Sequence, residues 1–300
     1  MKTAQAEPVE APSIATTLRA AAAQLAAVSD TPRLDAELLM AAALAVTRSD
    51  LLIRHAASPV PRAFASHFAR RLRHEPVAQI LGVQEFYGLE FIVTPDVLIP
   101  RGDSETLIEA ARASLAAAPP ARVLDLGTGS GALLCATLTL WPRAHGIGTD
   151  RSLAALAVAA ANAGRLGLAP RARLLHADWD APGWADRLGT FEVILANPPY
   201  VEDNAALDRQ VRGYEPAGAL FAGADGLDAY RALLPQLPAL LAPGGIALVE
   251  IGATQGPAVA ALAAVSGLAA ALRRDLGDRP RALELTGELK KGLGIARDPH

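Results

Sequence analysis

The chain has 300 residues, which is enough for one large α/β domain and a small second domain. Its hydrophobic fraction is 51% with only 4% aromatic residues, so we expect a core of aliphatic side chains and closely packed helices. A net charge of −3 excludes a global attraction to polyanions and disfavours a protein that binds mainly by neutralising phosphates. The single cysteine, Cys135, excludes an intramolecular disulfide and is expected as a small apolar helix residue in a reducing compartment.

The N-terminal stretch, residues 1–13, is polar and acidic and contains proline. It lacks a positively charged start followed by an apolar block, so we predict no signal peptide and a cytoplasmic location. The longest uncharged stretch, residues 251–272, mixes polar residues and glycines with weakly hydrophobic alanines. We predict a turn and a buried helix there rather than a membrane span.

Residues 14–73 show helical periodicity. Leu18 and Leu25 recur at helix spacing, and Leu34 and Leu38 repeat the pattern after a break that ends in a proline. Proline is favourable at a first helical position, so a new helix is expected to begin there. Two further start signals follow within the same region, and the whole pattern predicts a small helical bundle.

The sequence pattern changes after this bundle. Residues 84–93 place aromatic and β-branched residues on both sides of a glycine, which predicts a β-hairpin. Helical and short apolar segments then alternate, which predicts an α/β fold with a mostly parallel, doubly wound sheet and helices on both faces. The strand candidates are residues 123–126, 145–149, 172–176, 193–196 and 246–251. We therefore divide the chain into an N-terminal helical domain (1–75), for which we hypothesise a role in substrate recognition, a β-hairpin connector (76–100) and an α/β domain (101–300).

A glycine-rich turn follows the first of these strands. It has the sequence Gly127-Thr128-Gly129-Ser130-Gly131, with Asp125 shortly before it and a predicted helix directly after it. Glycines let the backbone approach a ligand closely, and the start of the helix offers unpaired N–H groups. The spacing Gly-x-Gly-x-Gly differs from the dinucleotide pattern Gly-x-Gly-x-x-Gly, and by itself it is also typical of a plain tight turn.

Two neighbouring strand ends strengthen the case for a ligand. The second strand ends in Asp150, whose carboxylate can accept hydrogen bonds from both ribose hydroxyls of an adenosine. The third strand is followed by Asp178 and Trp179, where a polar group can meet the adenine edge and an aromatic ring can flank the base. Trp179 alone is equally compatible with a core aromatic. Together, the three strand ends predict an adenosine site.

The fourth strand ends in Asn197-Pro198-Pro199-Tyr200. Two prolines can simply terminate a strand, because they lack N–H donors. The tetrapeptide also supplies an amide oxygen, a rigid backbone carbonyl before a proline, and an aromatic face. Two acceptors of this kind suit a planar –NH2 group, whose lone pair they turn toward an electrophilic methyl group held at about 3–3.5 Å.

These residues support a resemblance to a known family. The run from Asp125 to Gly131, then Asp150, and then Asn197-Pro198-Pro199-Tyr200 resemble motifs I, II and IV of amino-methyltransferases that act on planar nitrogens. Further matching runs are Glu75-Pro76-Val77-Ala78-Gln79-Ile80, Glu85-Phe86-Tyr87, Leu98-Ile99-Pro100-Arg101, Glu215-Pro216, Asp225-Gly226-Leu227 and Val249-Glu250-Ile251-Gly252. From about Arg33 to Leu285 the chain resembles the peptide chain release factor glutamine N5-methyltransferases.

The resemblance implies a Rossmann-like class I methyltransferase that uses S-adenosylmethionine. Its implied target is the glutamine of the Gly-Gly-Gln loop in class I release factors, whose methylation modulates translation termination. The cofactor contacts are expected at Gly127, Thr128, Gly129, Ser130, Gly131, Asp150, Asp178, Trp179 and Asn197. The substrate amide is expected at Asn197, Pro198, Pro199 and Tyr200, with Asn197, Pro198 and Tyr200 as the catalytic residues.

We expect a monomer with no metal ion and no specific nucleic-acid or membrane partner. The chain departs from the family at Gly102, where a proline is usual, which is expected to loosen that loop.

Two rival functions remain open at this point. An amino-methyltransferase acting on adenine or guanine of RNA or DNA suits the same tetrapeptide but requires basic or base-flipping machinery. The region from residue 48 to 76 has six arginines against two acidic residues, which is a possible RNA-binding patch or simply a solvated helix face. A non-catalytic adenosine-binding protein is the second rival, and it would be expected to lose residues such as Asn197 and Tyr200.

Overall fold

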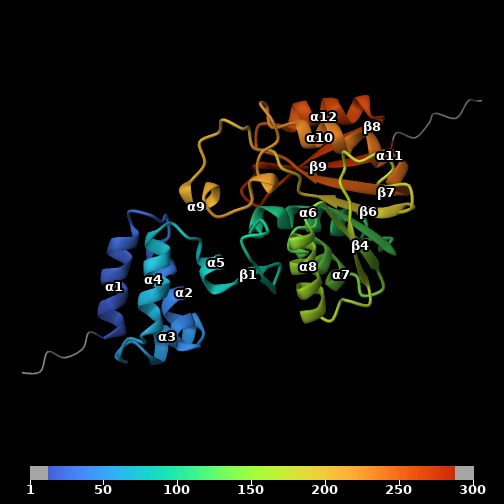
Figure 1. Ribbon diagram of the computed structural model, residues 1–300. Coiled ribbons are helices and arrows are strands. Elements are labelled where there is room, and N and C mark those ends of the chain that lie inside the picture. The colour runs from blue at the N-terminus through green and yellow to red at the C-terminus, as the bar shows by residue number, and fades with distance from the viewer. Residues whose placement is uncertain (1–12, 288–300) are drawn as a thin grey trace, which may run out of the picture. The chain divides into compact units, whose positions relative to one another are not determined.

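The computed structural model (Figure 1) describes residues 13–287, so the stretch on which the predicted location rests lies outside the described residues except for Ser13. The chain forms two compact units. One unit extends to Val83 and includes Leu207–Tyr214, and the other contains Gln84–Ala206 and continues from Glu215. Nothing in the sequence pattern indicated that Leu207–Tyr214 belongs with the N-terminal helices.

The first unit is the helical bundle that the periodicity predicted. Its helices are α1 (Ile14–Leu25), α2 (Pro32–Leu44), α3 (Arg48–Arg54), α4 (Ala63–Leu72), α5 (Val77–Leu81) and the short α9 (Arg209–Arg212). Ser13 caps α1 by accepting a hydrogen bond from the backbone N–H of Thr16 at 3.4 Å, and Pro32 begins α2. The core of this unit includes Leu18, Leu39 and Phe64.

Helix α2 buries a different face from the one expected. Leu34 is 39% exposed and Leu38 is half-buried, whereas Asp35 and Glu37 are buried. The reason is electrostatic, because the buried guanidinium of Arg71 donates to the Asp35 carboxylate at 2.7 Å. Charged groups can be buried when they are paired in this way.

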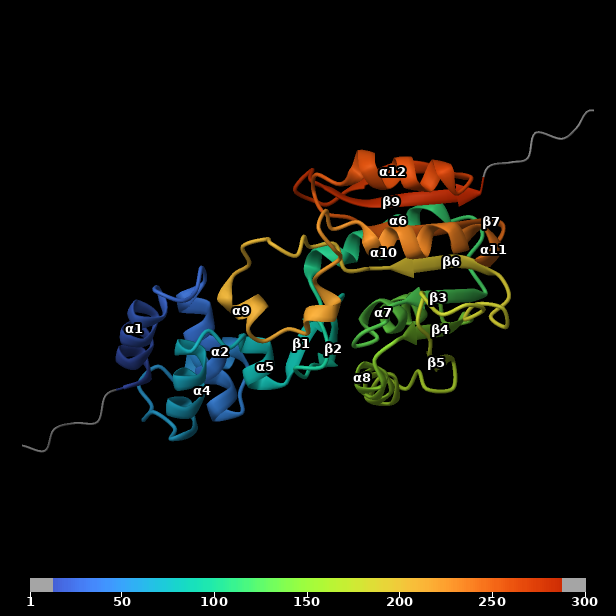
Figure 2. The ribbon, with the colours of Figure 1, turned by 45° about the horizontal axis from the view of Figure 1, so that its top comes forward.

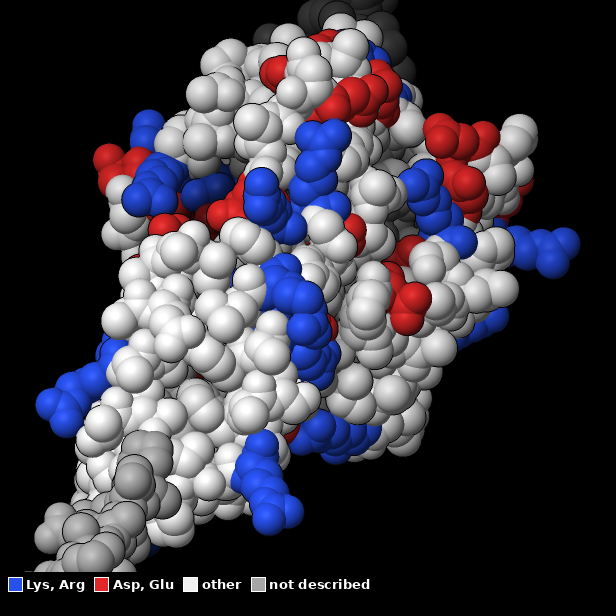
Figure 3. All heavy atoms as spheres, turned by 60° about the vertical axis from the view of Figure 1, so that its left-hand side comes forward, with Lys and Arg blue, Asp and Glu red and all other residues white. Residues whose placement is uncertain are grey.

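The same unit pairs most of the arginines between residues 48 and 76 with acidic side chains. Four of the six arginines form ion pairs: Arg48 with Glu37 (2.7 Å), Arg54 with Asp50 (3.0 Å), Arg70 with Glu75 (2.5 Å) and Arg71 with Asp35 (2.7 Å). Two of these acidic partners lie before residue 48, so a charge count over the segment alone leaves them out. Figure 3 shows that Lys and Arg side chains on one face are scattered, several of them directly beside Asp or Glu side chains.

The second unit is built on a seven-stranded sheet. Its strands are β3 (Arg122–Leu126), β4 (His145–Asp150), β5 (Ala172–His176), β6 (Phe191–Ala196), β7 (Leu241–Glu250), β8 (Leu268–Arg274) and β9 (Pro280–Gly287). The spatial order is β5-β4-β3-β6-β7-β9-β8, which Figure 2 shows from β9 at the top to β5 at the bottom. The first five strands pair in parallel and β9 is antiparallel to both of its neighbours. A separate hairpin of β1 (Val83–Phe86) and β2 (Leu89–Ile92) precedes the sheet.

Helices cover both faces of this sheet. One core contains side chains of α6 (Glu105–Ser114), α7 (Ala132–Leu140) and α8 (Leu153–Arg165), and the other contains side chains of α10 (Asp228–Leu233), α11 (Leu237–Leu240) and α12 (Gly256–Val265). Along β3, Val123 belongs to the first core and Leu124 to the second, as the alternation of a strand requires. Short 3₁₀ turns are η1 (Gly102–Ser104), η2 (Ala217–Ala219) and η3 (Leu234–Gln236). The predicted Rossmann-like fold is confirmed.

Strands β8 and β9 were not predicted. Residues 251–272 contain the expected turn and helix α12, but their last part begins β8. This strand lies at the sheet edge and buries only Leu268, so it lacks the apolar alternation by which a strand is recognised. Within residues 13–287, no helix is long and apolar enough to cross a membrane.

Candidate active site

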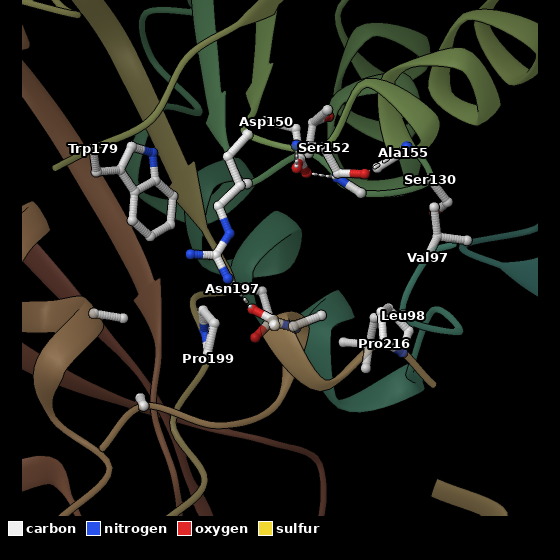
Figure 4. Close-up of a pocket in the computed structure, with 18 of the residues that line it drawn as sticks. Val97, Leu98, Ser130, Asp150, Ser152, Ala155, Trp179, Asn197, Pro199 and Pro216 are labelled. Atoms are coloured by element: carbon white, nitrogen blue, oxygen red, sulfur yellow. Dashed lines mark hydrogen bonds between the residues drawn. The ribbon is translucent and has the colours of Figure 1, made fainter. Parts of the chain in front are cut away.

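A cavity of about 430 Å³ lies in the second unit, at the carboxyl ends of the parallel strands. Ligands bind at this edge in open α/β sheets, and the volume is within the usual range for a small-molecule site. Its walls include residues that directly follow β3, β4, β5 and β6, together with residues 96–101 and part of 216–232. Figure 4 shows Asp150, Ser152 and Trp179 toward one end and Asn197 and Pro199 toward the other.

The glycine turn after β3 forms one wall. Gly127, Thr128, Gly129 and Ser130 all line the cavity. The first two donate their backbone N–H groups to the carbonyl oxygen of Thr149 at 2.9 and 2.8 Å, which fixes the turn against β4. Gly127 has a φ of 73°, and a Cβ atom there would lie 3.2 Å from the Trp179 ring. The missing side chain therefore permits both the backbone conformation and the contact with the indole.

Gly131 has a different position from the rest of the turn. It caps helix α7 with a φ of 79° and does not line the cavity. A Cβ atom there would lie 3.2 Å from the Cβ of Ala159 in α8. The residue therefore allows α7 and α8 to approach each other, and the structure does not bring it to the predicted cofactor site.

Asp125, in strand β3, also holds the glycine turn in place. Its Oδ2 accepts hydrogen bonds from the Thr128 hydroxyl at 2.6 Å and from the backbone N–H of Leu134 at 3.2 Å. Burial raises the pKa of this carboxyl to about 7. Its side chain does not reach the cavity, so it acts on the shape of the glycine turn.

Asp150 reaches the cavity from the end of β4. Its Oδ2 accepts the backbone N–H of Gly129 and its Oδ1 accepts that of Ser152, both at 2.9 Å. Each carboxylate oxygen has a second lone pair, so the group can still accept from a ligand hydroxyl. The two backbone bonds thus orient a charged acceptor beside the glycine turn.

Asp178 and Trp179 follow β5 and also line the cavity. The Oδ1 of Asp178 accepts the backbone N–H of Asp180 at 3.1 Å, and the carbonyl of Trp179 accepts from the Gln236 amide at 3.1 Å. These bonds fix the loop that presents the indole. Trp179 also packs against the second core, as the alternative interpretation of this residue expected.

Only part of the Asn197-Pro198-Pro199-Tyr200 segment after β6 lines the cavity. Asn197 and Pro199 line the cavity, whereas Pro198 is buried and Tyr200 lies outside the lining. The Nδ2 of Asn197 donates to the Ser104 hydroxyl at 3.0 Å. The hydroxyl of Tyr200 donates to Oε1 of Glu250 at 3.4 Å.

Sequence reasoning missed Ser104 and Glu250 as site residues. The Ser104 hydroxyl donates to Oε2 of Glu250 at 2.5 Å, and both residues are buried. Burial raises the pKa of Glu250 to about 7. A carboxylate at the end of an apolar strand identified Asp150, and the same signal at the end of β7 identifies Glu250.

The wall formed by residues 96–101 is held by Glu215, another residue that was not predicted for the site. Its Oε2 accepts the backbone N–H of Ile99 at 3.1 Å, and its Oε1 pairs with the guanidinium of Arg101. Gly102 follows directly and begins the η1 turn in open space. Residues 13–287 contain no group of three His, Cys, Asp or Glu side chains that could hold a metal ion.

Comparison with known proteins identifies the family. Residues 16–82 match the PrmC N-terminal domain, and residues 104–213 match the methyltransferase small domain. The release factor glutamine methyltransferase of Cereibacter sphaeroides is 47% identical over 88% of this chain and 95% of its own length. That of Bradyrhizobium diazoefficiens is 40% identical over 94% of each chain.

Among solved structures, a ribosomal protein L11 methylase from Lactobacillus delbrueckii subsp. bulgaricus matches with a TM-score of 0.47 and 22% identity. The match covers 66% of this chain and 84% of that one. The family assignment rests on the sequence relatives, which are well above 30% identity over nearly their full length. The chain belongs to the release factor glutamine methyltransferase family.

Proposed function

We propose that the chain transfers a methyl group from S-adenosylmethionine to the side-chain amide nitrogen of the glutamine in the Gly-Gly-Gln motif of class I release factors. One observation supports this most directly. The glycine turn and Asp150, which suit an adenosine, line the same cavity as Asn197, which suits a planar amide. Membership of the family supplies the substrate class.

The cavity fits the proposed cofactor. Gly127 lines the cavity and leaves room for the Trp179 indole, and Asp150 offers a charged acceptor for the ribose hydroxyls. Asp178 and Trp179, which line the same cavity, are proposed to contact the adenine. When bound, the cofactor supplies an electrophilic methyl group on a sulfonium. The protein residues have the task of binding it and of placing the nucleophile.

The residues at the other end of the cavity orient the substrate amide. The nitrogen lone pair of an amide is delocalised and poorly nucleophilic. We infer that Oδ1 of Asn197 accepts one N–H group of the glutamine and that the backbone carbonyl before Pro199 accepts the other, although the Pro198 side chain itself is buried and does not line the cavity. Tyr200 belongs to the substrate side of this arrangement. Holding two reactants in line can contribute about 7–11 kcal/mol to lowering a barrier.

The N-terminal helices are proposed to recognise the release factor, which would separate substrate recognition from cofactor binding. A nucleic-acid substrate is less well supported, since four arginines of the possible RNA patch already have acidic partners. A non-catalytic role is disfavoured because Asn197 lines the cavity with its amide already hydrogen-bonded.

The substrate class is tested by incubating the protein with radiolabelled S-adenosylmethionine and separate pools of release factor, RNA and DNA. The proposal predicts label in the release factor and none in a factor whose Gly-Gly-Gln glutamine is replaced by alanine. Label in RNA or DNA would favour the rival amino-methyltransferase.

A further inference from the structure

Buried polar side chains link Asn197 to Ser104 and Glu250. The Asn197 Nδ2 donates to the Ser104 hydroxyl at 3.0 Å, and that hydroxyl donates to Oε2 of Glu250 at 2.5 Å. Ser104 is 4% exposed and Glu250 is 1% exposed, so water does not compete for these bonds. The other oxygen of Glu250 accepts the hydroxyl of Tyr200 at 3.4 Å.

Ser104 lies where the η1 turn runs directly into α6. Its backbone is helical (φ −69°, ψ −15°), and its side chain forms no capping bond to the first turn of α6. The hydroxyl connects Asn197 with Glu250, 93 and 146 residues away along the chain.

The direction of each bond follows from the number of protons available. An ionised carboxylate can only accept, so the single proton of the Ser104 hydroxyl is directed to Glu250. Toward Asn197, the Ser104 oxygen can then act only as an acceptor. The Asn197 amide must therefore turn its NH2 group to Ser104, which leaves Oδ1 free in a residue that lines the cavity.

We propose that Ser104 and Glu250 are positioning residues that lock the Asn197 amide with Oδ1 available to the substrate N–H. This inference rests on the proposed function of Asn197 as an acceptor. An Asn197 amide flipped by 180° would present its NH2 group to the substrate amide, and two N–H groups cannot form a hydrogen bond with each other. The lock thus removes the orientation in which the site cannot hold the substrate.

The same geometry predicts how pH affects the reaction. Three charged or titratable groups face Glu250. Arg281 and the hydroxyl of Tyr200 lower the pKa of Glu250, and Asp103 raises it. Tyr230 donates its hydroxyl to the backbone carbonyl of Glu250 at 2.9 Å. Because burial raises the pKa of Glu250 to about 7, its carboxylate is present above this pH and is lost below it. A protonated Glu250 can donate to Ser104, which then can donate to Asn197 and release the lock.

The first test is a double-variant cycle measured as single-turnover methyl transfer to a release factor. Ser104→Ala should slow transfer by about 10- to 100-fold, and Ser104→Thr should recover most of the lost rate because it keeps the hydroxyl. Adding Ser104→Ala to Asn197→Ala should cause little further loss, since the lock acts through Asn197. A near-normal rate in Ser104→Ala, or full additivity with Asn197→Ala, would overturn the proposal.

Ser114→Ala is the matched control. Ser114 ends the same helix and donates to Oε2 of Glu284 at 2.8 Å, so the change removes a serine–glutamate bond away from the cavity. It should leave the transfer rate close to that of the unaltered protein. In Glu250→Gln, which keeps the size of the side chain but removes its ionisable group, the fall in transfer rate below about pH 7 should be smaller than in the unaltered protein, and the remaining fall reflects Asp125, whose pKa is also about 7. An unaltered pH profile in this variant would contradict the role of Glu250.

A second measurement separates this proposal from the proposed function. In NMR spectra of the protein labelled at asparagine nitrogen, one Asn197 Nδ2 proton should exchange slowly with solvent, and Ser104→Ala should remove that protection. If this is observed while no release factor is methylated, the lock stands and the proposed substrate is wrong. If the Asn197 signals do not respond to Ser104→Ala, the lock is wrong whatever the substrate.

Discussion

The side-chain amide of Asn162 is paired with the backbone of Ile92 through two hydrogen bonds. Its Oδ1 accepts the N–H of Ile92 at 2.7 Å, and its Nδ2 donates to the carbonyl of the same residue at 3.0 Å. The Nδ2 also donates to the carbonyl of Ser130 at 2.8 Å. One fully buried amide on α8 therefore joins the β1–β2 hairpin to the glycine turn of the cavity.

We expect Asn162→Ala to lower the free energy of unfolding by about 2–4 kcal/mol, because three backbone groups, one buried and two partly buried, lose a partner. It should also weaken binding of S-adenosylhomocysteine by loosening the turn. Urea denaturation and calorimetric titration measure the two effects. The exposed Asn204 offers a control, and Asn204→Ala should change stability by less than about 0.5 kcal/mol. Equal effects of the two variants would contradict this account.

Breaking the buried ion pair of the N-terminal unit should be costly. Arg71→Ala leaves the Asp35 carboxylate buried without its guanidinium partner, so we expect a loss of about 3–5 kcal/mol in unfolding free energy. Arg54→Ala, which removes an exposed pair with Asp50, should cost less than about 1 kcal/mol. Chemical denaturation compares them, and similar losses would show that Arg71 does not have the structural role described.

Replacing Gly102 by the proline usual in the family should stabilise the protein by about 0.4–1 kcal/mol. Gly102 occupies the first position of η1, where an N–H has no partner within the helix, and Arg101 before it is extended at φ −108° and ψ 139°. A Cβ atom on Gly102 would meet nothing within 4 Å. Gly88→Pro, at a φ of +73°, should instead destabilise. The melting temperatures of the two variants should therefore shift in opposite directions.

Asp150→Ala should weaken binding of S-adenosylhomocysteine by about 1.5–3 kcal/mol, since a charged acceptor for the ribose hydroxyls is lost. Asp150→Asn, which keeps one acceptor oxygen, should have a smaller effect. Calorimetric titration gives both affinities. Unchanged affinity in a folded Asp150→Ala variant would exclude this strand end from the cofactor site.

Site residues set by a local sequence pattern were predictable, whereas contacts between residues far apart in the sequence were not. Asp150 and Asn197 each end an apolar strand, and parallel strands bring their carboxyl ends to one edge, so a local pattern was enough to bring them together. Ser104 and Glu250 meet only because α6 packs beside β7, and no local pattern shows that contact.

The fold was predictable to a similar extent. Strands β3 and β6 are apolar and largely buried, whereas β8 contains three alanines that are equally typical of a helix. In α2, apolar periodicity predicted that Leu34 and Leu38 would be buried. Asp35 is buried instead because it pairs with Arg71, a contact that the local sequence does not show.

The central claim is that Asn197 acts on the nitrogen of a release factor glutamine. Its most direct test is single-turnover methyl transfer by the unaltered protein and by Asn197→Ala, with a release factor carrying Gly-Gly-Gln and with the same factor carrying alanine at that glutamine. We expect Asn197→Ala to reduce the rate by about 10²- to 10³-fold with little change in cofactor affinity, because its acceptor gains strength as the nitrogen becomes positive. The alanine-substituted factor should receive no methyl group. A near-normal rate in Asn197→Ala, or methylation of the alanine-substituted factor, would contradict the account.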